Sequence, residues 1–168
     1  MAAGATYTPI ATTTLGSAAS TIDFTSISSS YTDLVLILNT IATTGGTQIM
    51  HCRVGNGSLD TGSNYSDTFI TGDGSTASSG RNTSVTSTGN LVISSAQWCN
   101  TILNFQNYSN TTTYKSILGR SNIAGWGLRQ GVSLWRSTSA INTIQIFADG
   151  GANFATGTQA TLYGIAAA

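Results

Sequence analysis

Short runs of alternating apolar and polar residues recur along the chain, each bounded by Gly, Ser, Thr or Asn. The clearest example covers residues 141–148, where Ile144 and Ile146 alternate with polar neighbours. A period of two predicts a strand with one buried face. Residues 149–151, Asp-Gly-Gly, tolerate positive φ and therefore predict a turn that sends the chain back. The C-terminal run TQATLYGI then predicts a return strand that closes a sheet.

The same unit of apolar run and polar turn repeats along the chain and predicts an all-β fold. We expect a single-domain β-sandwich, jelly-roll-like, with about eight to ten short antiparallel strands and almost no helix. Composition agrees: only 7% of residues are charged, with one Lys and no Glu, the residues that populate exposed helical faces. The clearest expected strands cover residues 20–27, 31–41, 48–54, 91–94, 97–108, 114–118, 127–135, 141–148 and 158–165.

One run does not alternate. Residues 34–38, LVLIL, are apolar throughout. Such a run predicts a strand covered on both faces, as in a sandwich interior or at a subunit interface. A buried helix is the alternative, although polar residues bound the run closely on both sides.

Two segments carry weaker patterns. Residues 1–14 are polar apart from Tyr7 and Ile10, and we expect an extended N-terminal arm or edge strand ahead of a β-sandwich domain over 15–168. Tyr7 and Ile10 are the candidate docking contacts of that arm. Residues 58–90 predict a long Gly/Ser-rich loop with short strands near 68–71 and 84–86, and a loop of that length is either functional or flexible.

The charge balance bears on partners. Net charge is zero, so no electrostatic attraction to nucleic acid or to an acidic membrane surface is expected. No targeting segment is visible, and the longest apolar run is far shorter than the ~20 residues of a membrane span. A sparsely charged surface lacks the usual protection against association. We therefore expect a homo-oligomer, with a trimer favoured over a dimer.

Few residues offer catalytic chemistry. His51 is the only histidine, and no nucleophile-elbow sequence accompanies it, so we expect a structural role and no enzyme. Zinc would require His51, Cys52 and Cys99 to meet, but adjacent residues of a strand point to opposite faces. We expect two buried free thiols, no metal and no cofactor.

Three aspartates lie in the long loop region, at Asp60, Asp67 and Asp73. Two carboxylates at the right separation would suit a glycosidase, and loop carboxylates also bind calcium. Paired loop aspartates more often cap turns, and no Asp-x-Asp-x-Asp spacing is present.

Two pairs of aromatic and basic residues are the remaining signal. Trp126 with Arg129, and Trp135 with Arg136, would suit a stacking platform for a sugar ring or a peptide. The alternative is that both tryptophans belong to the core and that Arg136 caps a neighbouring turn.

Three stretches resemble a family of small virion proteins of tailed bacteriophages. They are WRSTSAINTI…GANFATGTQATLYGI over residues 135–165, YTPIATTTLGSAASTIDFTSISSSYTDLVLIL over 7–38 and NGSLDTGSNYS over 56–66. The resemblance implies a compact β-sandwich virion component, usually multimeric and without enzymatic activity. It carries over no catalytic residue, because its motifs are structural.

Two functions follow from the resemblance. The first is a capsid decoration or cement protein that stabilises the head by binding the major capsid protein. The second is a tail-fibre or receptor-binding module that recognises a host surface glycan. The chain begins at Met and carries no long shaft or trimerising segment, so we expect the first role, on the capsid surface, ahead of a place in the tail.

Overall fold

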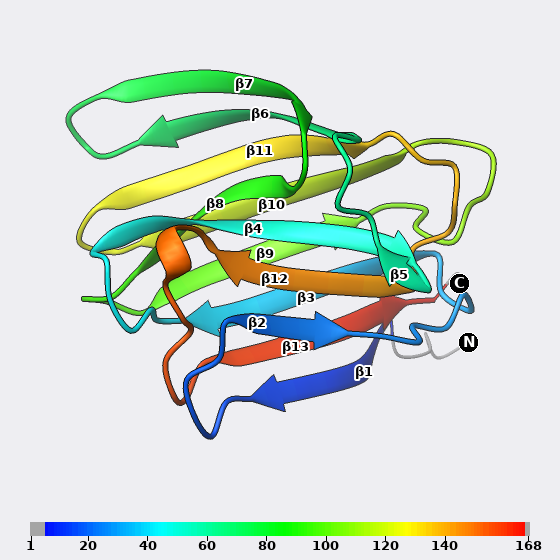
Figure 1. Ribbon diagram of the computed structural model, residues 1–168, viewed down its shortest axis with the longest axis horizontal. Helices are drawn as coiled ribbons and strands as arrows, with labels where there is room; N and C mark the ends of the chain where they lie inside the picture. Colours follow the sequence, from blue (N-terminus) through cyan, green and yellow to red (C-terminus); the bar gives the residue numbers. More distant parts are fainter. Residues whose placement is uncertain (1–5, 167–168) are drawn as a thin grey trace.

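The computed structural model describes residues 6–166 and shows two antiparallel β-sheets packed face to face, which confirms the predicted all-β sandwich (Figure 1). The larger sheet has eight strands, in the order β1 (Tyr7–Thr14), β13 (Gln159–Ile165), β3 (Asp33–Thr40), β9 (Cys99–Phe105), β10 (Lys115–Ile123), β11 (Gly127–Trp135), β6 (Tyr65–Gly72) and β7 (Ala77–Val85). The smaller sheet contains β2 (Thr21–Phe24), β12 (Thr143–Ala148), β4 (Thr47–Asn56) and β5 (Ser58–Leu59), and β8 (Thr88–Ser94) also pairs with β4.

The topology is jelly-roll-like. Successive segments alternate between the sheets, and β12 lies between β2 and β4 in the smaller one. In the larger sheet the meander β9-β10-β11 lies between β3 and the hairpin β6-β7, where a simple jelly roll has one strand. The described residues contain thirteen strands, more than predicted, and a short 3-10 turn, η1 (Asp149–Gly151). No helix within residues 6–166 is long and apolar enough to cross a membrane.

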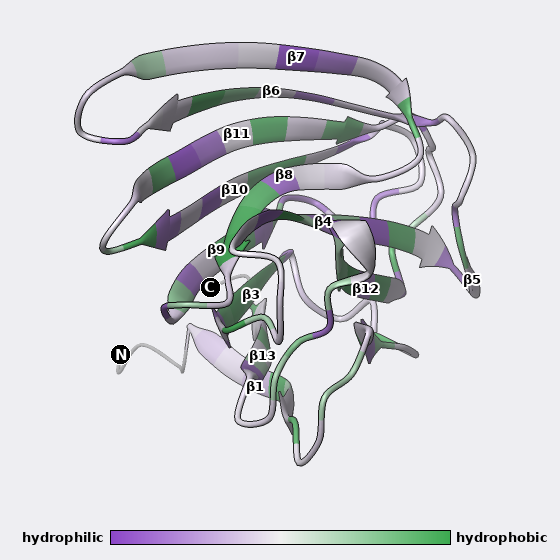
Figure 2. Ribbon diagram, turned by 60° about the vertical axis from the view of Figure 1, so that its left-hand side comes forward, coloured by the Kyte–Doolittle hydropathy of each residue, from purple (hydrophilic) through white to green (hydrophobic). Residues whose placement is uncertain are grey.

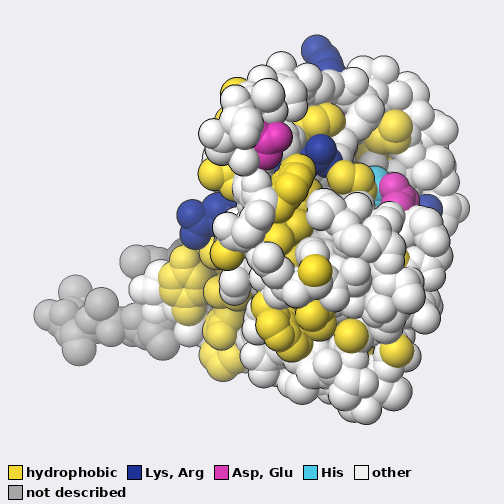
Figure 3. All heavy atoms as spheres, turned by 90° about the vertical axis from the view of Figure 1, so that its left-hand side faces the viewer, with side chains coloured by type: hydrophobic (Ala, Val, Ile, Leu, Met, Phe, Trp, Pro, Cys, Tyr) yellow, Lys and Arg dark blue, Asp and Glu magenta, His cyan; other side chains and the backbone are white. Residues whose placement is uncertain are grey.

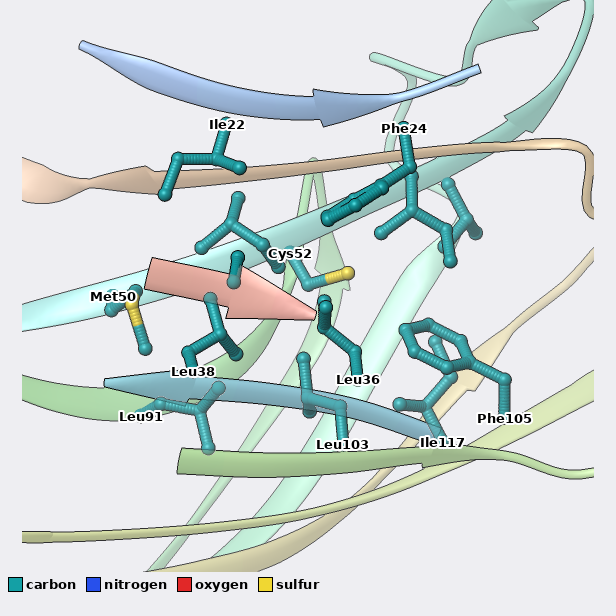
Figure 4. Packing of buried hydrophobic residues seen from close by; sticks show 14 of the residues in the cluster. Ile22, Phe24, Leu36, Leu38, Met50, Cys52, Leu91, Leu103, Phe105 and Ile117 are labelled. Atoms are coloured by element: carbon teal, nitrogen blue, oxygen red, sulfur yellow. The ribbon is translucent and has the colours of Figure 1, made fainter. Parts of the chain in front are cut away.

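The core lies between the two sheets, and alternation places its side chains there. β10 is the clearest case: every second residue from Lys115 to Ile123 is buried, and those between are exposed. Figure 2 shows the corresponding bands of polar and apolar residues on β10 and β11. Leu36 and Leu38 of β3 meet Met50 and Cys52 of β4 across the interface (Figure 4). Each fully buried side chain of this kind contributes about 1.5–3 kcal/mol to folding.

The run at 34–38 forms β3, so the strand prediction is confirmed over the helix alternative. Its inward residues, Leu34, Leu36 and Leu38, are fully buried. Ile37 points the other way and is 41% exposed, so residues 6–166 leave this side of the strand partly uncovered.

Within 58–90 the strand predicted near 68–71 is confirmed as part of β6, and the one near 84–86 overlaps the end of β7. The long loop is wrong, because most of the segment forms β5, β6, β7 and the start of β8. β6 alternates, with Tyr65 and Asp67 buried, but β7 is built largely from small polar residues that show no apolar period. β8 is buried at every position because it pairs with β4 and also faces β10 and β11.

At the N-terminus, Tyr7–Thr14 forms β1, which pairs with β13 at one edge of the larger sheet. The first five residues of the expected arm lie outside the described residues. Ile10 packs against the core, which contradicts its expected role as a docking contact, because strand pairing turns its side chain inward.

Candidate functional site

The outer face of the larger sheet carries the most exposed apolar side chains of the described residues. Eight large apolar side chains are 40% exposed or more, and six of them point outward from this sheet: Tyr7 on the edge strand β1, and five on β3, β6, β10 and β11. With Ile102, which is partly buried, those five form what we call the apolar sheet face: Ile37, Ile70, Ile102, Leu118, Leu128 and Val132.

Strand register brings these side chains together. Leu118 of β10 lies directly opposite Val132 of β11, and Ile37 of β3 lies opposite Ile102 of β9. Opposite residues in an antiparallel pair have Cβ atoms about 4.5–5.5 Å apart, so each pair forms one apolar contact. The apolar sheet face therefore extends over five strands, β3, β9, β10, β11 and β6, with the polar Arg120 and Gln130 among its apolar side chains.

This surface is hollowed. A hollow of about 420 Å³ lies over β9, β10 and β11, with Ile102 and Leu128 beside the polar side chains of Asn100, Asn122 and Gln130. A second, of about 410 Å³, lies on the other side of Leu128, between β6 and β7. Exposed aliphatic side chains and hollows therefore alternate on this face.

Charge is sparse on this face. Arg120 is its central charged residue, opposite Ile102, and its side chain forms no hydrogen bond or ion pair with any described residue. None of β9, β10 and β11 contains a carboxylate. Figure 3 views the molecule from one end, where hydrophobic side chains lie between a few charged ones.

The outer face of the smaller sheet is organised differently. Phe147 lies between two cationic or polar groups: the Arg53 guanidinium is 4.3 Å from its ring centroid, and the His51 ring stacks on it with centroids 5.4 Å apart. His51 Nε2 lies 3.0 Å from Asp149 Oδ2. Gln145 Nε2 donates to Asp23 Oδ1 over 2.8 Å. The polar groups of this face are thus paired with one another.

His51 also borders a hollow of about 400 Å³, together with Asp67, Asn82 and Asp149. Asp67 is buried and accepts a hydrogen bond of 2.8 Å from Asn82 Nδ2. Among the described residues His51 has Asp149 as its ion-pair partner, and no side-chain hydroxyl is hydrogen-bonded to it. Asp149 therefore orients the His51 imidazole, but no hydroxyl nucleophile is hydrogen-bonded to that imidazole among the described residues.

The structure does not place Trp135 and Arg136 on an open platform, which corrects that hypothesis. Trp135 is 3% exposed, and its Nε1 donates to Asp60 Oδ2 over 2.8 Å. Arg136 Nη2 donates to the carbonyl oxygens of Ser63, at 2.7 Å, and Tyr65, at 3.3 Å. Both side chains therefore fasten the segment between β5 and β6 to the end of β11.

Asp60 is held by several donors. Partial burial acts to raise its pKa, but hydrogen bonds from Trp135, Asn64 and the Gly62 amide outweigh it and hold the pKa below its ordinary value. The carboxylate is thus stabilised in its charged form by the fold itself.

Trp126 and Arg129 are also separated. Trp126 is partly buried and packs against a small cluster of Val92, Cys99 and Ile123. The Arg129 guanidinium turns inward, where it bonds Asn90 of β8, lies 4.7 Å from the Phe69 ring centroid, and donates from Nε to Thr71 over 2.9 Å. Burial lowers the pKa of Arg129. Arg129 therefore braces β8 against β6 and β11, and no stacking platform forms.

The three aspartates of the 58–90 region do not converge on one site. Asp73 caps its own turn by accepting from the amides of Ser75 and Thr76, while Asp60 and Asp67 bond separate partners. No group of three His, Cys, Asp or Glu side chains that could hold a metal occurs within residues 6–166. The prediction of two buried free thiols is confirmed for Cys52 and Cys99, and burial raises the pKa of both.

Of the predicted contacts, Tyr7 alone is well exposed. It is 54% exposed on β1, with its ring edge-on to Tyr163 at 6.1 Å between centroids. The sequence reasoning missed the apolar sheet face. The available signal was the apolar residues at outward positions of consecutive strands, Leu118, Leu128 and Val132, which alternation alone assigned to no face.

No protein-family model and no curated protein matches this sequence. The resemblance to phage virion proteins therefore stays a prediction.

Proposed function

We propose that the protein is a structural component of a bacteriophage virion, a capsid decoration or cement protein that packs its apolar sheet face against capsid subunits. The observation that carries this proposal is the set of five large apolar side chains left 40% or more exposed on β3, β6, β10 and β11. The outward side of β3 supports it, because an apolar run such as LVLIL is typical of a strand covered on both faces, and Ile37 is uncovered within the described chain.

The size of the face suits such a contact. Its five strands, spaced ~4.8 Å apart and each about eight residues long at ~3.3 Å per residue, span roughly 630 Å². A standard protein interface buries about 800 Å² on each partner. If about half of the face is apolar, its burial contributes on the order of 8 kcal/mol, within the ~4–15 kcal/mol cost of association. One copy therefore binds weakly, and repetition over a shell makes the attachment effective.

In this role the partners are the major capsid protein and further copies of the same chain, and the place is the virion surface. The protein acts without catalysis and without a cofactor, by covering surface on neighbouring subunits. A net charge of zero supports protein contacts over contacts with nucleic acid or a membrane.

The test is binding to phage heads that lack this protein, measured by co-sedimentation with purified protein. Leu118→Glu and Val132→Glu each place a carboxylate in the middle of the apolar sheet face, where docking would desolvate it. We expect each to weaken binding roughly tenfold or more. Thr44→Glu, in an exposed loop away from this face, is the matched control and should bind like the unmodified protein. Equal binding by all three variants would show that the apolar sheet face does not dock on the head.

A tail-fibre or receptor-binding module remains the second candidate, and one observation favours it. The 420 Å³ hollow combines the amides of Asn100, Asn122 and Gln130 with Arg120 beside aliphatic side chains. Amides both donate and accept hydrogen bonds, as sugar hydroxyls do. Copy number in purified virions separates the two roles: hundreds of copies per particle support decoration, and a handful in multiples of three or six supports the tail.

A further inference from the structure

β7 is the last strand of the larger sheet and pairs only with β6. In an antiparallel pair, alternate residues direct their N–H and C=O groups away from the neighbour. β7 therefore presents a row of backbone donors and acceptors along its outer side, the kind of edge onto which another strand adds.

The two edges of the larger sheet differ in how they are protected. β1, at the opposite end, contains Pro9, and its register with β13 shifts between Pro9 and Ala11. Proline and bulges both obstruct the addition of a strand. β7 pairs in regular register with β6 from Ala77 to Thr83, without proline, and its irregularity falls only beyond, at Ser84 with a φ of 55°.

The side chains of β7 also permit close approach. Ala77, Ser78, Ser79 and Gly80 are small, and Arg81 is the only charged residue of the strand. Gly80 has a packing reason of its own, since a Cβ there would lie 2.5 Å from Phe69 Cζ. Figure 2 shows β7 mostly pale or purple, so the strand offers backbone groups rather than an apolar surface.

We propose that β7 of one copy pairs antiparallel with β7 of a second copy, so that two larger sheets join into one continuous sheet. A second copy is the fitting occupant because the segment is complementary to itself. With a two-fold axis at Gly80, Ser79 lies opposite Arg81 of the other copy, so the two guanidinium groups do not face each other directly.

This pairing has a consequence for docking. A two-fold axis perpendicular to the sheet leaves both apolar sheet faces on the same side of the dimer. The dimer then presents about twice the docking surface, which offsets the weakness of a single contact. This interface rests on the proposed function and deepens it, and it gives a two-fold dimer where the sequence alone favoured a trimer.

The experiment uses the isolated protein, so its outcome is independent of capsid binding. Light scattering with size exclusion should give twice the chain mass at high concentration and dissociation on dilution. Hydrogen exchange at the amides of residues 77–83 should slow in the dimer while β1 is unchanged. A monomer at all concentrations, a trimer, or a dimer with unprotected β7 amides would overturn the proposal.

Two neighbouring proline variants sharpen this test. Ser78→Pro and Ser79→Pro each remove one amide, and because amides alternate, one of the two variants leaves the β6 ladder intact. The variant that melts like the parent should dimerise roughly tenfold more weakly, since the symmetry removes two hydrogen bonds. Undiminished dimerisation of that variant would contradict pairing through β7. If pairing through β7 fails this test, the docking of the apolar sheet face is unaffected, because co-sedimentation with phage heads tests that docking separately.

Discussion

The two outer faces of this sandwich differ in whether their outward side chains have partners within the chain. On the smaller sheet, Phe147 is covered by Arg53 and His51, and Asp149 pairs with His51. On the larger sheet, Leu118 and its neighbours are exposed and touch one another across strands. Both faces are built on the same alternation of inward and outward residues. Folding requires apolar residues at the inward positions only. The residue types at the outward positions can therefore differ between the two faces according to the surroundings of each face.

The strongest test of this comparison uses adjacent residues of β3. Leu36→Ala removes a fully buried side chain and should lower the free energy of unfolding by about 2–5 kcal/mol. Ile37→Ala, on the exposed side, should cost about 1 kcal/mol or less but weaken binding to phage heads. Urea unfolding and co-sedimentation measure the two effects. Equal losses of stability at both positions would mean that Ile37 already has a partner within the monomer.

The reverse pattern is expected on the smaller sheet. Phe147→Ala removes the aromatic ring that Arg53 and His51 cover, and should lower the unfolding free energy by about 1–2 kcal/mol. Binding to phage heads should be unchanged once the variant is folded, as shown by circular dichroism. Loss of binding in a folded Phe147→Ala protein would indicate that the smaller sheet, and not the apolar sheet face, docks on the head.

The smallest expected effect is on the pH dependence of stability. It concerns the Asp60 carboxylate, which accepts hydrogen bonds away from both outer faces. The pKa of Asp60 is lower in the folded protein than its unfolded value of about 3.9, so its contribution to stability is present above that pH. It is lost as pH falls toward the folded pKa. The stability gap between the parent and Asp60→Asn should therefore narrow between about pH 5 and pH 3 in thermal melts. A gap that stays constant over that range would indicate that Asp60 does not titrate with folding.

The alternation of apolar and polar residues predicts the sandwich because the apolar residues of each strand pack in the core. It therefore identified most of the strands. Between residues 72 and 90 it missed most of β7, which uses small polar side chains, and the start of β8, which is buried on both sides. Neither strand gives a period of two. The Trp135 and Arg136 hypothesis failed because neighbours in sequence do not reveal burial: Asp60, which holds Trp135, is 75 residues away.

The apolar sheet face depends on register, which sequence patterns do not specify between distant strands. Ile37 and Ile102 come from segments far apart in the chain and meet only because β3 pairs with β9. The continuous run at 34–38 was a further local sign, since it predicted either a strand in the sandwich interior or a strand at a subunit interface.

A cryo-electron microscopy map of the intact virion tests the central claim most directly. The account predicts many copies on the shell, each with β9, β10 and β11 toward the capsid and with Phe147 of the smaller sheet toward solvent. Copies whose larger sheet faces solvent, or particles without the protein, would contradict it.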